Sequence, residues 1–283
     1  MWLHKETVIP DNGVEQGEDW SEVVSTQVAA QLGVPCATTR LCSRADRRGS
    51  LSLSIVPEGH DLWEGTVVMQ NAGLKDYFPH AEGLPGTDPS RPTVKRPGHS
   101  LVNIRTVLSE VVAPPEFSGP PDSSGFDVFA GYMILDALIA NRDRHEQNWA
   151  VLAPQLNSTS ESLAPSYDHA SSLGYNLTDP KRCAKLERTG GLQGWAEKGT
   201  AYRFEHEGKP PTLVEHASNA VALCSAQGAE WWRTQLDRLD ISLVLETLQN
   251  GDVPGMSEVA ARFACDLLEL NLRRLRDAIC NRA

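Results

Sequence analysis

Three short apolar stretches in the first quarter of the chain have the composition of strands. They are residues 2–5, 38–43 and 49–56. Between the first two, residues 20–32 place their apolar side chains at helical spacing on one face. We expect Asp19 to be the N-cap of this helix, with Glu22 in the capping-box position, and Gly33 to end it. The pattern predicts a small mixed region of three strands and one helix.

The most apolar segment of the chain, residues 126–140, predicts a buried core helix. Apolar side chains cover most of its circumference, and the segment is shorter than the about 20 residues that span a membrane. Two long loops rich in Gly and Pro precede it, at residues 72–99 and 114–125. A short amphipathic helix is expected between these loops, at residues 100–112.

The chain beyond this helix divides into a hairpin and a helical remainder. Residues 149–152 and 163–168 have the pattern of two short strands joined by a polar turn. Further helices are expected at residues 212–226, 228–239, 241–249 and 256–281. We therefore predict an α+β fold with a small N-terminal lobe at residues 1–70 and a mainly helical lobe at residues 71–283.

Composition and charge narrow the classes of function. The 283 residues are 40% hydrophobic and 22% charged, as in an ordinary globular protein. The net charge of −11 argues against broad binding to the phosphate backbone of nucleic acids. No apolar run predicts a membrane span, and the first five residues lack the apolar core of a signal peptide, so we expect a cytoplasmic protein. The six cysteines form no Cys-x-x-Cys pair and are expected to be reduced thiols.

A polar run, Asn-Arg-Asp-Arg-His-Glu-Gln-Asn at residues 141–148, directly follows the core helix. An Asp, an Asn five residues later and a second Asp after the hairpin are the side chains that a phosphoryl-transfer site needs. Asp143 would accept the proton of a hydroxyl, and Asn148 and Asp168 would hold Mg²⁺ against ATP phosphates. The alternatives are a solvated turn for the polar run and a turn-capping role for Asp168.

Other charged residues near these positions suggest supporting roles. A strand Lys followed by a helical Glu, here Lys5 and Glu22, is how kinases contact the ATP phosphates; the alternative is a surface Lys and a capping Glu. His145 and His169 each follow a key Asp, and no partner residue supports a zinc site. We expect buried, hydrogen-bonded histidines and count His145 with the cofactor-binding residues. The arginines at 142 and 144 would pair with carboxylates or meet a phosphorylated residue.

Several segments resemble the HipA-like kinase family, which is related to protein kinases and phosphatidylinositol kinases. In chain order they are residues 18–22, 32–35, 48–52, 56–59, 141–148, 163–168 and 254–257. The most specific are Asn-x-Asp-x-His-x-x-Asn and Tyr-Asp, which look like the family's catalytic loop and metal-binding strand. The resemblance implies a protein-kinase-like fold with a reduced N-lobe sheet and a Ser/Thr protein kinase mechanism. It implies that Lys5 contacts ATP phosphates, that Glu22 holds Lys5, and that ATP and Mg²⁺ are the cofactors.

One departure from the family leaves other functions open. Family members carry strands and a phosphate-binding loop before the Lys, which here is the fifth residue. The alternatives are a start further upstream, a reduced kinase, or a pseudokinase that serves as an interaction module. A kinase of small molecules or lipid head groups is a further alternative, against which the acidic charge argues. A protein substrate is expected, with no nucleic acid or membrane partner, and a toxin role is not implied.

Overall fold

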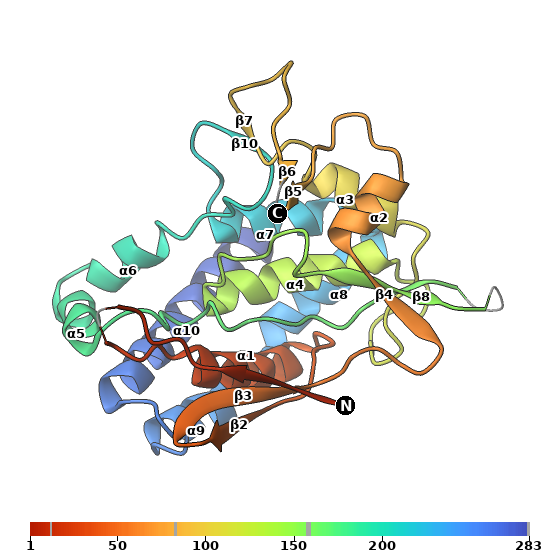
Figure 1. Cartoon of the computed structure of the whole chain (residues 1–283). Helices are drawn as coiled ribbons and strands as arrows, with labels where there is room; N and C mark the ends of the chain where they lie inside the picture. Colours follow the sequence, from red (N-terminus) through yellow and green to blue (C-terminus); the bar gives the residue numbers. More distant parts are fainter. Residues whose placement is uncertain (12, 82–83, 157–159, 282–283) are drawn as a thin grey trace.

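The structure, a computed structural model, describes all residues except 12, 82–83, 157–159 and 282–283. An antiparallel sheet in the order β1-β3-β2 forms the N-terminal part. Its strands are β1 (Trp2–Glu6), β2 (Thr39–Arg44) and β3 (Arg47–Leu53). The three strands predicted from the sequence are thus confirmed, and α1 (Glu18–Leu32) packs beside them (Figure 1).

The ends of α1 test the predicted caps. Gly33 ends the helix in the left-handed conformation, as predicted, with φ of 78°. The predicted N-cap at Asp19 is wrong, because the helix begins at Glu18 and Gly17 precedes it without a side-chain cap. The amide of Ser21 already donates to the Gly17 carbonyl at 2.9 Å, so Asp19 and Glu22 both lie inside the helix, where they are buried. Burial inside the helix directs Glu22 toward the interior instead of toward a cap.

A second antiparallel sheet, in the order β4-β8-β9, connects distant parts of the sequence. Its strands are β4 (His60–Glu64), β8 (Ala150–Pro154) and β9 (Ser162–Leu163). The predicted hairpin is confirmed as β8 and β9, whereas β4 was not predicted. Because β4 pairs with β8, this sheet joins the two predicted lobes, and the boundary at residue 70 remains a prediction.

The segment after β9 leaves the sheet earlier than the sequence predicted. Ser166 donates its amide to the Pro35 carbonyl and accepts at its own carbonyl from the amide of Ala37, both at 2.9 Å. These bonds hold residues 164–168 against the segment that precedes β2 of the N-terminal sheet. The segment that ends at Asp168 is therefore placed between the two sheets.

The helix α4 (Gly125–Ile139) is the centre of the helical part, and every one of its residues is buried. A capping box formed by Ser124 and Asp127 starts it. Since it is apolar on all sides, it must be covered all round, and the other helices surround it (Figure 1). They include α3 (Leu101–Leu108), α7 (Leu213–Ala222), α8 (Ala226–Arg238), α9 (Ser242–Gln249) and α10 (Glu258–Ile279).

Short elements that the sequence pattern did not predict complete the fold. The helices are α2 (Gly65–Asn71), α5 (Asp179–Glu187) and α6 (Gly191–Ala196). The remaining strands are β5 (His80–Ala81), β6 (Leu84–Pro85), β7 (Val94–Lys95) and β10 (His206–Glu207). Across the described ranges, each helix is too short or too polar to cross a membrane.

Candidate active site

The polar run at residues 141–148 is fixed to the end of α4 by one buried carboxylate. Ala140 takes the left-handed conformation, which ends the helix, and the Asn141 amide donates to the Asp136 carbonyl at 2.8 Å. The Asp136 carboxylate accepts two hydrogen bonds from Arg144, at 2.8 and 2.9 Å, and one from the Asn141 side chain at 2.8 Å. All three side chains are buried. The loop at residues 141–148 is therefore held rigidly at the C-terminal end of α4.

Arg144 also connects this loop to the segment after β9. One of its guanidinium nitrogens donates to the carbonyl of Asn148 at 2.6 Å and to that of Tyr167 at 3.4 Å. Burial alone would lower the pKa of Arg144, but the charge and the hydrogen bonds of Asp136 together with smaller contributions raise it. A permanently charged arginine therefore holds the segments of Asn148 and Asp168 together, as expected from the predicted hairpin. The pairing of Arg144 with a carboxylate was one of the two roles expected from the sequence.

The Asp143 side chain is held through one oxygen only. Its Oδ1 accepts from Arg203 at 2.7 Å (Nε) and 2.5 Å (second nitrogen), and the Asp143 amide donates to the Asn141 side chain at 3.0 Å. Among the described residues, no hydrogen-bond donor reaches its Oδ2. The carboxylate is oriented, about a quarter exposed, and keeps one oxygen for another proton donor. Arg203 lies sixty residues away in sequence and was not predicted.

Asn148 and Asp168 both keep oxygen atoms that a metal ion could use. The Asn148 side-chain nitrogen donates to the Asp143 carbonyl at 2.8 Å, which leaves its side-chain oxygen facing away from that bond. Asp168 has a positive φ of 55°, a conformation that Asp tolerates better than most residues. The described residues contain no cluster of three His, Cys, Asp or Glu for a metal. Mg²⁺ commonly uses only one or two protein carboxylates, so this pair suits it.

Lys5 and Glu22 lie at the same cavity but have different partners. The Lys5 ammonium is 3.0 Å from Asp168 Oδ1, whereas Glu22 Oε1 is 3.5 Å from Nδ1 of His169. Burial alone would lower the pKa of Lys5, but the charge and hydrogen bond of Asp168 raise it. The structure thus brings Lys5 to the predicted metal ligand Asp168, whereas Glu22 pairs with His169. The holding of Lys5 by Glu22 remains a prediction.

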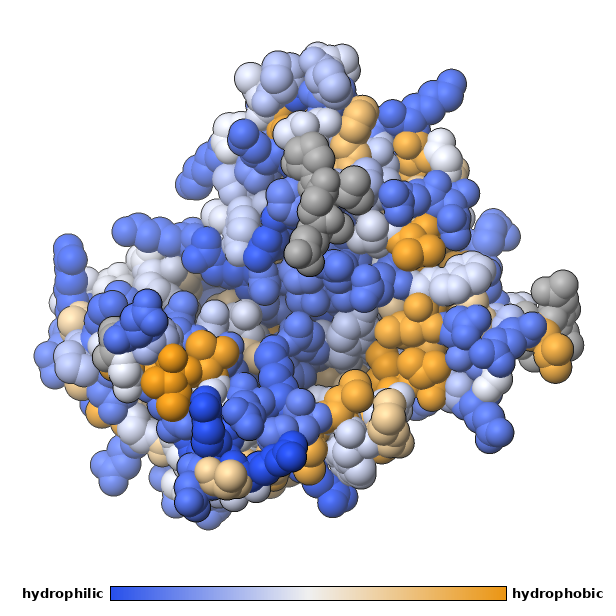
Figure 2. Space-filling view, in the orientation of Figure 1, coloured by the Kyte–Doolittle hydropathy of each residue, from blue (hydrophilic) through white to orange (hydrophobic). Residues whose placement is uncertain are grey.

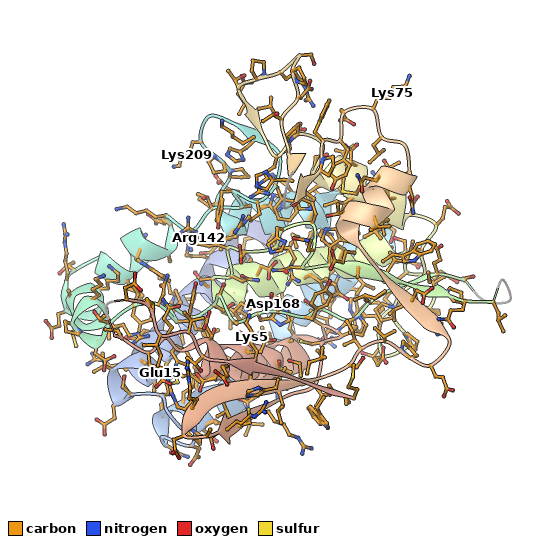
Figure 3. All side chains as sticks on the ribbon, viewed as in Figure 1. Lys5, Glu15, Lys75, Arg142, Asp168 and Lys209 are labelled. Atoms are coloured by element: carbon orange, nitrogen blue, oxygen red, sulfur yellow. The ribbon has the colours of Figure 1, made fainter. Side chains whose placement is uncertain are left out.

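The cavity that these residues share measures about 300 Å³. Its walls are mainly aliphatic, while Lys5, Glu22 and Asp168 supply its charged groups. The aliphatic residues are Leu3, Ala37, Leu53, Ile55, Val56 and Leu62. On the face shown in Figure 2, hydrophilic side chains gather at the centre and hydrophobic ones border them, and Figure 3 shows Lys5 and Asp168 close to each other there. The arrangement suits a ligand with an apolar end against the aliphatic wall and a polar end that meets Lys5, Glu22 and Asp168.

The two histidines of the site have opposite electrostatic environments. Burial lowers the pKa of His145, and its Nδ1 accepts from the Gln147 amide at 3.2 Å. Burial also acts to lower the pKa of His169, but Cys36 and Glu22 raise it to about 10. The Ser166 hydroxyl lies 2.7 Å from Nε2 of His169. Both histidines are hydrogen-bonded, as predicted, but only His169 is buried, because His145 is half-buried in the loop. The cofactor-binding role of His145 remains a prediction.

In an NMR titration, His145 should titrate below the ordinary value of 6.5 and His169 well above it. Since the His169 pKa is raised on folding, its stabilising contribution is complete below pH 6.5 and is lost as the pH rises toward about 10. Glu22→Gln should lower the His169 pKa and leave that of His145 near its wild-type value. A His169 resonance that titrates at or below 6.5 in the wild-type protein would contradict the assignment.

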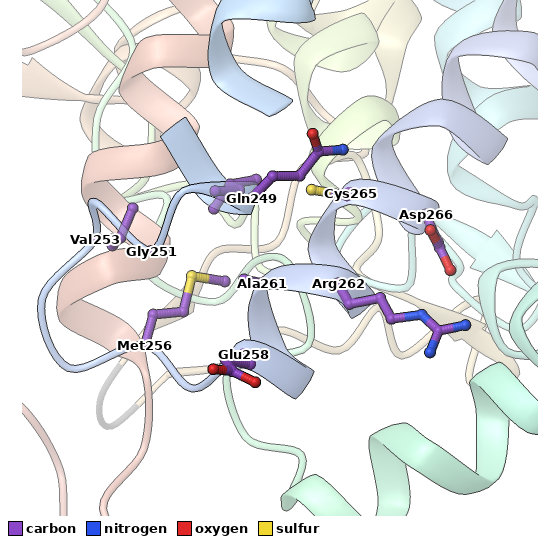
Figure 4. A pocket seen from close by; sticks show the side chains of 10 residues that line it. Gln249, Gly251, Val253, Met256, Glu258, Ala261, Arg262, Cys265 and Asp266 are labelled. Atoms are coloured by element: carbon purple, nitrogen blue, oxygen red, sulfur yellow. The ribbon is translucent and has the colours of Figure 1, made fainter. Parts of the chain in front are cut away.

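A separate cavity, of about 320 Å³, lies between α9 and α10 (Figure 4). Met256, Arg262, Cys265 and Asp266 are among the residues that line it. None of its lining residues lines the cavity of Lys5, and none is a predicted site residue. The predicted site residues therefore favour the cavity of Lys5 as the place for chemistry.

Comparison with known proteins supports the fold. No protein-family model and no curated protein matches the sequence, but 39 chains of solved structures match. The Helicobacter pylori proinflammatory kinase CtkA aligns with a TM-score of 0.69 and 15% identity, over 100% of this chain and 89% of that chain. A weaker similarity, with a TM-score of 0.42 and 12% identity over 91% of this chain and 57% of that chain, is to a Shewanella oneidensis MR-1 toxin–antitoxin complex of HipA, HipB and operator DNA. The predicted kinase-like fold is confirmed: this chain has the fold of the kinase CtkA.

Proposed function

We propose that the protein is an ATP- and Mg²⁺-dependent phosphotransferase that phosphorylates a Ser or Thr hydroxyl of a protein. The observation that carries the proposal is the convergence of three polar side chains at one point of a kinase-like fold. Arg144 ties the backbone of Asn148 to that of Tyr167, next to Asp168, and Asn148 is bonded to the backbone of Asp143. These contacts support a site in which Asp143 acts as the base and Asn148 and Asp168 as metal ligands, the groups that phosphoryl transfer requires.

The cavity of about 300 Å³ is the proposed nucleotide site. Its aliphatic walls would bury an adenine ring, since ligand pockets are mostly apolar with a few placed polar groups. Lys5 would leave its ion pair with Asp168 and meet the phosphates, which carry more negative charge than one carboxylate. Glu22 lines the same cavity and adds its charge to the field at Lys5.

Asn148 and Asp168 would hold the magnesium ion through side-chain oxygens. When bound, Mg²⁺ neutralises the negative charge that develops on the phosphates during transfer. Asp143 is the proposed base, because its free Oδ2 is available to an incoming hydroxyl while Arg203 fixes its Oδ1. A nucleotide-binding module without transfer is the second candidate, since Asp143 and Asp168 are each engaged by a cation in this conformation.

The Asp168→Ala variant should bind Mg·ATP at least about tenfold more weakly than the wild-type protein, because a loss of about 1.4 kcal/mol already gives that factor. Isothermal titration calorimetry with and without Mg²⁺ measures it. Asp168→Asn should weaken binding similarly, and it tolerates the positive φ that strains Ala. Asp122→Ala, at an exposed position in the loop before α4, is the control and should bind like wild type. Unchanged Mg·ATP affinity in both Asp168 variants would show that Asp168 is not a ligand of Mg²⁺.

A further inference from the structure

A second cavity, of about 460 Å³, lies beside the proposed base. It is lined by Arg142, Asp143, Tyr175, Trp195, Tyr202 and Arg203, among others. No residue lines both this cavity and the nucleotide cavity. A hydroxyl that reaches Asp143 through it would therefore arrive by a route separate from that of the nucleotide.

Among the charged side chains of this cavity, one arginine has no carboxylate as a partner within the described part of the chain. Arg142 and Arg203 both lie over the ring of Tyr202, at 5.3 and 5.0 Å from its centroid. Arg203 is paired with Asp143. Arg142 is exposed and, in the described part of the chain, has no ion pair. The two guanidinium groups and one carboxylate give the lining an excess of one positive charge, in a chain whose net charge is −11.

A guanidinium held by a tyrosine ring is ready to bind an anion. The ring restricts the side chain, so less conformational freedom is lost when a ligand binds. Arginine forms paired hydrogen bonds with carboxylates and phosphates that a lysine cannot reproduce. Arg142 lines the same cavity as Asp143 and directly precedes it in the sequence. The unpaired cation therefore stands beside the base, where the group next to an acceptor hydroxyl would lie.

We propose that this cavity binds the acceptor segment and that Arg142 selects acceptors with an anionic group beside the hydroxyl. The inference rests on the proposed kinase function and names its substrate class: a Ser or Thr in an acidic or already phosphorylated peptide. Arg142 acts here as a specificity residue and Arg203 as a positioning residue for Asp143. A different role, contact with the transferred phosphoryl group, would make Arg142 equally important for every acceptor.

Peptide binding in the absence of nucleotide tests this preference without turnover. Four labelled peptides with one Ser differ only at the flanking position, which carries Asp, phosphoserine, Asn or Lys, and fluorescence anisotropy measures their affinity for the full chain. The anionic peptides should bind about fivefold more tightly than the Asn peptide, as expected for an ion pair of about 1 kcal/mol with an exposed arginine. In Arg142→Gln the difference should fall below about twofold. The tighter of the two anionic peptides identifies the source of the anion.

The control is Arg105→Gln, which removes an exposed arginine from α3, a helix that does not line the cavity. It should keep the full preference. Equal affinities for all four peptides, no binding of any, or an undiminished preference in Arg142→Gln would overturn the proposal. ADP formation with the same peptides and Mg·ATP tests the kinase function separately. If Arg142→Gln slowed transfer to the Asn and Asp peptides by the same factor, Arg142 would act on the phosphoryl group and the selection of acidic acceptors would be refuted.

Discussion

The Asp143→Asn variant should lose phosphoryl transfer by about a thousandfold while it binds Mg·ATP like the wild-type protein. General bases contribute about 10²- to 10⁴-fold to such reactions. Asparagine keeps the size of the side chain and an oxygen that accepts the hydrogen bonds now made by Arg203. What it lacks is the basic second oxygen. Transfer is measured as radiolabel incorporated from ATP, and nucleotide affinity by calorimetry on the same preparation.

A matched exposed aspartate separates this effect from a general loss of charge. Asp122→Asn removes one carboxylate from the loop before α4, at a position that lines neither cavity of the site, and should transfer like wild type. If Asp143→Asn also transferred at the wild-type rate, Asp143 would not be the base. If Asp143→Asn lost nucleotide binding together with transfer, Asp143 would serve to maintain the nucleotide site. Its proposed role as a base that does not contribute to nucleotide binding would then be wrong.

Much of the candidate site could be predicted because its residues lie close in sequence to strong patterns. The apolar run at 126–140 fixes where the core helix ends, and the polar run must follow at that end. The hairpin of β8 and β9 then returns the chain toward the same place. These local rules bring Asp143, Asn148 and Asp168 into one region. They say nothing of which cation each carboxylate meets.

The partners of these side chains could not be predicted, because they come from distant segments with weak patterns. Arg203 lies in a stretch with no clear periodicity, and α5 and α6 nearby have too few apolar residues for a visible stripe. The pairing of Lys5 with Asp168 depends on how the N-terminal sheet meets the segment after β9. One signal was present: Asp136 is a lone acid in an otherwise apolar stretch of helix, and a buried acid requires a partner.

That buried acid gives the second large effect: Asp136→Ala should lower the free energy of unfolding by about 3–5 kcal/mol. Asp136 and Arg144 are only 4% and 2% exposed, so the substitution leaves a guanidinium buried and unpaired. The Asn141 side chain loses an acceptor as well. Denaturant unfolding measures the change, and the Tm should fall by about 10 °C. Glu230→Ala breaks an exposed ion pair with Arg233, 73% and 43% exposed, and should cost less than about 1 kcal/mol.

Replacing both partners separates stability from positioning. Buried ion pairs can often be exchanged for apolar side chains at little cost, so Asp136→Leu with Arg144→Met should regain part of the lost stability. The carbonyls of Asn148 and Tyr167 would still lack their donor, which limits the recovery and frees the loop. We therefore expect a folded double variant that transfers phosphate poorly. A double variant that is both stable and fully active would show that the loop keeps its catalytic geometry without the buried arginine, and the positioning role of Arg144 would have to be abandoned.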